Sequence, residues 1–175
     1  MNARKLTAQQ FVPLIRAFCE AHGMEQIKAS YGWDAPSTTM FKGETVWEFS
    51  ATTPAKAVFQ APGAPLAGLE PRGEVIVGWG SMHFNTRDAE DGDATLIVGV
   101  FPEAQGKGYR TLILDWMSAR AKKLGATTAS MIVYKSNDKH YRRVMKECHT
   151  EGSPWLYAGD CWYPAPGYGM FVRPL

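Results

Sequence analysis

Residues Thr95–Arg110 read TLIVGVFPEAQGKGYR, and this stretch decides the fold. The part before Pro102 is almost entirely apolar or β-branched and is too short for a helix, which is typical of a strand buried on both faces. The proline ends that strand. Beyond the glycines, apolar residues recur at helical spacing as far as Leu124, which predicts an amphipathic helix. The order is therefore a buried strand, a glycine-bearing turn and a helix.

The turn between strand and helix has the properties of an anion site. The first turn of a helix leaves backbone N–H groups without acceptors inside the helix and carries the positive end of the helix dipole. Glycine at positions 106 and 108 lets a phosphate approach the backbone without meeting a Cβ atom. Lys107 and Arg110 add positive charge at the same place. We expect a pyrophosphate group to bind here.

The motif in this turn resembles that of a known family. The sequence contains neither the G-x-x-x-x-G-K-[ST] loop nor the G-x-G-x-x-G run of other phosphate-binding turns. Residues Val100–Tyr109, VFPEAQGKGY, resemble the acetyl-CoA motif V-x-P-x-x-[QR]-x-x-G-x-[GA] of the GNAT superfamily of N-acetyltransferases. Arg110 stands where that motif ends on a small residue. The alternative is an ordinary strand-to-helix turn that uses its glycines only for tightness.

The resemblance implies a fold and a mode of cofactor binding. The expected fold is a mixed α/β (α+β) domain with a mostly antiparallel central sheet, a parallel strand pair around the central helix, and helices on both faces. By position, the Val98 N–H would face the thioester carbonyl of acetyl-CoA and Val100 the pantetheine amides. Asn137 would contact the same arm, or would only cap a helix. The residues expected on the pyrophosphate are Gln105, Gly106, Lys107, Gly108, Tyr109 and Arg110.

Acyl transfer to an amine also needs a general acid and a general base. The resemblance implies a tyrosine acid on the helix after the last parallel strand, where Tyr141 is the candidate, although the family spacing would put that tyrosine at position 144. A packing role for Tyr141 is the alternative. His83 is the candidate base, and the carboxylates of Glu48 and Asp93, on or beside predicted strands, are further candidates for the same role. A strand histidine can equally be a hydrogen-bonded structural residue.

Composition narrows the class of protein. The chain has 175 residues, 45% of them hydrophobic, and a net charge of +2, which suits one domain over residues 1–175 and gives no reason to expect nucleic acid or an anionic membrane. Three cysteines with no C-x-x-C pair favour a reducing compartment, so we expect a cytoplasmic protein. The His and Cys spacing fits no zinc pattern, and we expect no metal.

The remaining elements follow from periodicity and turn signals. Residues 1–73 are predicted to carry acceptor-side elements and residues 74–175 the acetyl-CoA-binding core. A helix is predicted from the N-cap Thr7 to His22, with no strand before it. A short helical turn is expected within 24–35 and a Pro/Gly-rich loop at 61–73. Further strands are predicted at 45–50, 57–60, 74–85, 127–134, 155–162 and 168–172, and a helix at 139–147.

The sequence therefore predicts an N-acetyltransferase that moves the acetyl group of acetyl-CoA to a primary amine by direct attack in a ternary complex. The acceptor is a small molecule or a peptide, and the protein is a monomer or a homodimer. One alternative is a regulatory protein that binds acyl-CoA without turnover. Another is an interaction module whose phosphate site Arg110 blocks.

Overall fold

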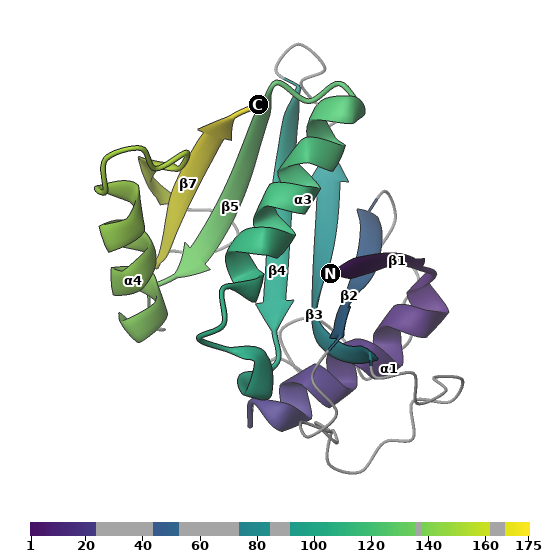
Figure 1. Cartoon of the computed structure of the whole chain (residues 1–175). Helices are drawn as coiled ribbons and strands as arrows, with labels where there is room; N and C mark the ends of the chain where they lie inside the picture. Colours follow the sequence, from purple (N-terminus) through teal and green to yellow (C-terminus); the bar gives the residue numbers. More distant parts are fainter. Residues whose placement is uncertain (24–43, 53–73, 85–91, 136–137, 162–166) are drawn as a thin grey trace. The chain divides into compact units, whose positions relative to one another are not determined.

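The computed structural model describes residues 1–23, 44–52, 74–84, 92–135, 138–161 and 167–175 (Figure 1). Asn137, the predicted strand 57–60, the turn within 24–35 and the loop 61–73 lie outside these ranges. The elements in chain order are β1 (Asn2–Leu6), α1 (Ala8–Ala21), β2 (Glu44–Thr52), β3 (Glu74–Phe84), β4 (Asp93–Val100), the 3-10 turn η1 (Pro102–Ala104), α3 (Tyr109–Lys123), β5 (Thr128–Tyr134), α4 (Asp138–Cys148), β6 (Leu156–Cys161) and β7 (Tyr168–Pro174).

The strands form one seven-stranded mixed sheet. Its order is β1-β2-β3-β4-β5-β7-β6. β4 and β5, which flank α3 in the sequence, pair in parallel, whereas β1 with β2, β5 with β7, and β6 with β7 pair antiparallel. This confirms the predicted mixed, mostly antiparallel sheet with one parallel pair. By its contacts the chain divides into two compact units, residues 1–81 with 98–114 and residues 82–97 with 115–175.

Strand β1 corrects the prediction that no strand precedes Thr7. Residues Asn2–Leu6 pair antiparallel with β2, and Arg4 lies opposite Glu48 in the register. Along this strand only Leu6 is buried. A strand at the edge of a sheet can stay polar because one side of it faces water. The segment NARKL therefore lacks the alternation that identifies a strand, and its pairing with β2 is a tertiary effect.

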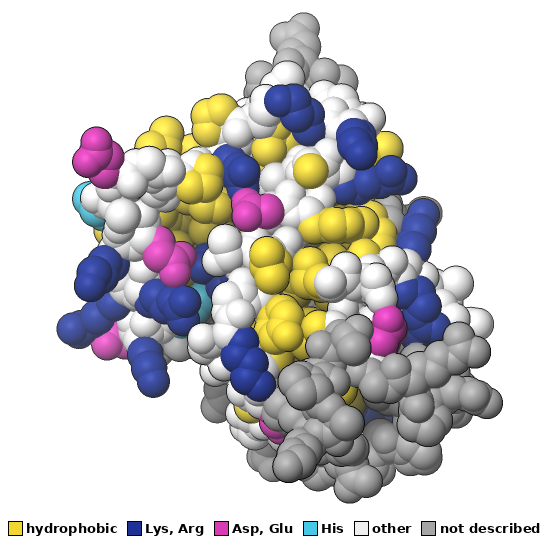
Figure 2. All heavy atoms as spheres, viewed as in Figure 1, with side chains coloured by type: hydrophobic (Ala, Val, Ile, Leu, Met, Phe, Trp, Pro, Cys, Tyr) yellow, Lys and Arg dark blue, Asp and Glu magenta, His cyan; other side chains and the backbone are white. Residues whose placement is uncertain are grey.

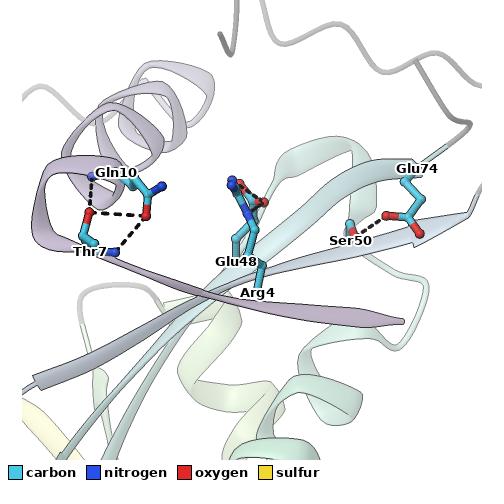
Figure 3. A network of polar contacts seen from close by, with 6 residues as sticks. All are labelled: Arg4, Thr7, Gln10, Glu48, Ser50 and Glu74. Atoms are coloured by element: carbon cyan, nitrogen blue, oxygen red, sulfur yellow. Dashed lines mark hydrogen bonds and ion pairs between the residues drawn. The ribbon is translucent and has the colours of Figure 1, made fainter. Parts of the chain in front are cut away.

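Helix α1 begins after the predicted N-cap, Thr7. The Thr7 hydroxyl accepts a hydrogen bond from the Gln10 N–H at 3.3 Å, and the Gln10 side chain accepts one from the Thr7 N–H at 3.0 Å, which together form a capping box (Figure 3). The apolar face of α1 then packs into the core of the first unit. The buried residues of that core are Leu6, Phe11, Leu14, Ile15, Phe18, Cys19, Val46, Trp79 and Phe101.

The helices α1 and α3 cover opposite faces of β3. The Trp79 ring packs against Phe11 and Phe18 of α1, with centroid separations of 5.3 and 5.5 Å. The next residue back, Gly78, faces the other way, because successive residues of a strand alternate between faces. A Cβ atom on Gly78 would stand 3.0 Å from Cδ1 of Ile113 in α3. The predicted placement of helices on both faces is confirmed.

The second unit is built around the strands β5, β7 and β6. β5 and β7 pair from Thr128↔Pro174 to Tyr134↔Tyr168, and Phe171 of β7 is fully buried. α4 buries Val144 and exposes a charged surface. Figure 2 shows acidic and basic side chains interspersed there, at the left of the view, and Arg142 pairs with Asp138 at 2.7 Å. None of the described helices combines the length and apolar composition that a membrane crossing needs.

Candidate active site

The turn between β4 and α3 has the backbone conformation that the sequence predicts. After η1, Gly106 has φ +75° and Gly108 has φ +82°. A Cβ atom on either glycine would meet nothing within 4 Å, so the conformation of the backbone, and not the space around it, requires glycine here. The N–H of Leu112 donates to the Gly108 carbonyl at 3.2 Å, where the helical hydrogen bonds start. The N–H groups before Leu112 form the first turn of α3.

The polar residues of the turn lie around this helix N-terminus. Gln105 and Lys107 are exposed, and Tyr109 and Arg110 are half-buried. Two cationic side chains thus stand within the same turn as the positive end of the α3 dipole. Such an arrangement can bind a phosphate through backbone N–H groups and charge together.

At the end of β4, the backbone groups of Val98 and Val100 point away from β3. The Phe101 N–H donates to the Val77 carbonyl at 3.1 Å, so residue 101 directs its backbone groups toward β3. Backbone groups of successive strand residues point alternately to the two neighbouring strands, so Val100 and Val98 direct theirs the other way. On that side, the residue pairs with β5 end at Leu96↔Met131. The amide and carbonyl groups predicted to bind the thioester and pantetheine therefore lie past the last pair of the ladder.

His22 at the end of α1 reaches this same part of β4. Its Nε2 lies 3.0 Å from the Val100 carbonyl oxygen, a contact between residues 78 positions apart. The ring is also packed on Phe18, with centroids 4.4 Å apart, and the His22 backbone N–H bonds to the Phe18 carbonyl at 3.1 Å. The sequence indicated His22 only as the end of a helix. Nothing in its spacing points to a strand so distant in the chain.

Tyr141, the predicted acid, lies half-buried on α4 in the second unit. Its ring packs edge-on against Phe171 at 6.2 Å, and a Cβ atom on Gly169 would come within 2.6 Å of Tyr141 Cε2. The ammonium of Lys135 lies 5.8 Å from the centre of the ring, within range of a cation–π interaction. A side-chain hydrogen bond joins Tyr141 to Tyr157 of β6. The residue therefore belongs to a polar network as well as to the packing of the unit.

The rest of this network links three further side chains, none of which the sequence indicated. The Tyr157 hydroxyl donates to the Asp160 carboxylate, and Lys135 Nζ lies 2.6 Å from the same carboxylate. The hydrogen bonds to Asp160 and then to Tyr141 raise the pKa of Tyr157. The hydrogen bond from Lys135 lowers the pKa of Asp160, and the same bond raises the pKa of Lys135. We call Lys135, Tyr141, Tyr157 and Asp160 the tyrosine network.

His83, the predicted base, is exposed near the end of β3. Its unit, residues 82–97 with 115–175, is not the one that holds Val98 and Val100, so the role of His83 stays a prediction. The other predicted partner, Asn137, lies outside the described residues.

Glu48 and Asp93, the two carboxylate candidates for the general base, each bond to another side chain. Glu48 is only 6% exposed and pairs with Arg4, whose guanidinium lies 3.0 Å from the carboxylate (Figure 3). Asp93 accepts a hydrogen bond from the Ser130 hydroxyl at 3.1 Å at the start of β4. In the described ranges, no three His, Cys, Asp or Glu side chains come together as metal ligands would.

The sequence of this chain matches the model of one known protein family. The model of the acetyltransferase (GNAT) family matches residues 27–149, which is more than half of the chain and includes β4, the glycine turn, α3, β5 and α4. No protein of curated function matches the sequence.

Solved structures resemble the fold along its whole length at low sequence identity. A chimera of the spermidine N-acetyltransferase SpeG from Vibrio cholerae and hSSAT superimposes with a TM-score of 0.61 and 13% identity, covering 99% of this chain and 96% of the other. An IAA acetyltransferase from Bacillus cereus gives 0.58 and 10%, covering 99% of both chains. A GCN5-related N-acetyltransferase from Kribbella flavida gives 0.54 and 14%, covering 99% and 97%. At these identities the likeness concerns the fold.

Proposed function

This chain belongs to the GNAT family of acetyltransferases and is an acyltransferase, and we propose that it transfers the acetyl group of acetyl-CoA to a primary amine. The observation that carries the proposal is the turn after β4. There, two glycines at positive φ lead into the N-terminus of α3, next to Lys107 and Arg110. A CoA molecule presents a pyrophosphate, which is the anion that such a turn is suited to bind. Gln105 and Tyr109 complete this proposed binding segment.

The backbone of β4 supplies the next part of the proposal. A thioester under attack by an amine develops negative charge on its oxygen, and a backbone N–H directed at that oxygen stabilises it. We assign this role to the Val98 N–H and assign the pantetheine amides to Val100. The support is the direction of both groups away from β3, past the last residue pair with β5. Asn137 is proposed to contact the same arm.

Tyr141 is the proposed acid that protonates the leaving thiolate. A tyrosine that gives up its proton becomes a phenolate, which a nearby cation stabilises. Lys135 lies over the Tyr141 ring, and this contact supports the assignment. The hydrogen bond to Tyr157, whose hydroxyl donates to Asp160, also connects the acid to exposed groups through which it recovers its proton from solvent.

The acceptor is proposed as a primary amine on a small molecule or a peptide. Transfer by direct attack requires the acceptor and acetyl-CoA to be bound together, and it requires a base, because most alkylamine molecules are protonated near neutral pH. His83 is one candidate for this base, and its exposed place near the end of β3 leaves the imidazole accessible to an acceptor.

A second candidate function is a CoA-binding protein without turnover. Val144 occupies the position at which the family spacing puts the acidic tyrosine, and it is fully buried. If Tyr141 does not replace that tyrosine, the chain would bind CoA through the glycine turn and leave the thioester intact.

Two measurements on the purified chain separate these functions. Calorimetry with CoA tests binding, and release of free thiol from acetyl-CoA with a panel of monoamines, polyamines and lysine peptides tests transfer. The proposal expects binding together with amine-dependent thiol release. Binding without release by any amine favours the second function, and the absence of binding contradicts both.

A further inference from the structure

His22 is a titratable residue beside the end of β4 that is proposed to bind the pantetheine arm, and the proposed function gives it no role. His22 contacts β4 through the Val100 carbonyl at 3.0 Å. This contact stands within one unit of the chain and does not depend on any arrangement of the two units. We propose that His22 is the general base that removes a proton from the acceptor amine, an inference that rests on the proposed function.

The contact with Val100 fixes which imidazole nitrogen of His22 carries the hydrogen. A carbonyl oxygen can only accept a hydrogen bond, so the Nε2 atom that faces Val100 must carry the hydrogen. In the neutral ring the lone pair is then on Nδ1. The described residues give Nδ1 no hydrogen-bond partner. The contact with β4 therefore leaves a ring nitrogen able to accept a proton.

The His22 imidazole is held in place by several contacts. His22 is the C-cap residue of α1, and its backbone N–H bonds to the carbonyls of Phe18 and Cys19 at 3.1 and 3.2 Å. The imidazole also packs on the Phe18 ring, with centroids 4.4 Å apart. A base that is fixed at three points loses little conformational freedom when it acts.

The His22 ring lies only a short distance along β4 from the proposed position of the thioester. Val98, whose N–H is proposed to face the thioester oxygen, lies two residues before Val100, which corresponds to about 7 Å along an extended strand. A base at that range takes a proton from the attacking nitrogen through one water molecule. Among the described residues, α1 and β4 pack against the ring and offer it the Phe18 ring and the Val100 carbonyl, neither of which carries a charge.

The reaction balances with this assignment. The acceptor ammonium gives one proton by way of water to Nδ1 of His22, which passes it to solvent. The neutral nitrogen then bonds to the thioester carbon, and the carbon–sulfur bond breaks. The thiolate takes up the proton of Tyr141, and the second proton that the nitrogen sheds restores Tyr141 by way of solvent. The products are an amide, free CoA thiol and one proton in solution.

The test uses His22→Gln, with His149→Gln as the control. A glutamine amide can still donate to the Val100 carbonyl, but it cannot accept a proton. His149 is also bonded to a backbone carbonyl, that of Met145 at 2.7 Å, and lies exposed at the end of α4. We expect His22→Gln to lower kcat by about 100-fold or more. CoA affinity and the unfolding midpoint should stay the same, and His149→Gln should match the wild type.

The pH profile distinguishes a base from a structural residue. In the wild type, kcat/KM should rise with pH across the range in which histidine side chains titrate, and His22→Gln should lose this rise. If the glutamine variant keeps both the rate and the pH profile, His22 is only structural and the inference is overturned. A wild-type protein that releases no thiol with any amine overturns the proposed function, and this inference with it.

Discussion

The indole ring of Trp79 lies over Gly99, so close that a Cβ atom on Gly99 would stand 2.3 Å from the indole Nε1. The same atom would be 2.9 Å from Cζ of Phe18. The glycine inside β4 is therefore needed for packing, because α1 and β3 bring two aromatic rings against the strand at this point. The rings of Trp79 and Phe18 can pack directly on β4 only because position 99 has no side chain.

Replacing Gly99 with alanine should destabilise the protein. The added methyl group forces two packed rings to move, and overpacking of this kind costs about 1–3 kcal/mol of the free energy of unfolding. Urea denaturation measures the change. In the Trp79→Leu variant, where the indole is gone, Gly99→Ala should lower the free energy of unfolding by less than it does in the wild type. If Gly99→Ala costs the same in both backgrounds, this explanation fails.

Gly108→Val should abolish detectable CoA binding, because its side chain projects from the turn proposed to approach the pyrophosphate. The matched control is Gly125→Val, since Gly125 also has positive φ, +97°, and also has no atom within 4 Å of a Cβ atom. Both variants should lose similar stability from the strained backbone. Calorimetry should find normal CoA affinity in the control alone. Equal affinity in the two variants would count against the placement of CoA at this turn.

Tyr141→Phe should lower kcat by about 100-fold while leaving CoA affinity unchanged, because it removes a proton donor and keeps the ring that packs on Phe171. Steady-state kinetics and calorimetry measure the two quantities. Tyr168→Phe removes the hydroxyl of another tyrosine of the same unit and should stay within about two-fold of the wild type. An unchanged kcat for Tyr141→Phe removes it as the acid.

The pKa of Tyr157 should fall toward the ordinary tyrosine value of about 10 in Asp160→Asn, since the hydrogen bond to that carboxylate is the main cause of its elevation. Ultraviolet absorbance of the phenolate, compared with Tyr157→Phe to isolate the signal, follows this titration. A raised pKa in the folded state contributes stability below the unfolded value that is lost as the pH rises through the folded value. Unfolding midpoints of Asp160→Asn and the wild type should therefore converge at strongly alkaline pH.

Arg4→Met should lower the free energy of unfolding by about 1–3 kcal/mol, because it leaves the buried Glu48 carboxylate without its cation. The estimate is below that for a fully buried pair, since the Arg4 side chain is 54% exposed. Arg142→Met is the control, as it breaks a largely exposed pair with Asp138 and should cost less than about 0.5 kcal/mol. Equal losses in denaturation experiments would show that burial of Glu48 does not matter.

Much of the candidate site could be predicted because its signals are local. The strand, the two glycines and the helix that follows them are consecutive in the sequence, and each has a conformational preference that the structure shows at Gly106, Gly108 and α3. The roles of the Val98 and Val100 backbone groups come from the resemblance and stay predictions.

The parts that were not predicted depend on contacts between distant residues. β1 is a strand only because β2 pairs with it, and its polar sequence carries no pattern of its own. His22 meets Val100 across 78 positions of the chain. Lys135, Tyr157 and Asp160 come from β6 and the end of β5, and only the packing of β7 between those strands brings them together.

The sequence by itself therefore determined the order of most elements and the backbone conformation of one glycine turn, because backbone preference and apolar periodicity act over a few neighbouring residues. The tertiary structure decided which strand edge carries β1, where His22 and Tyr141 are placed, and which side chains share their protons. Those outcomes depend on residues that the chain brings together only when it packs its core.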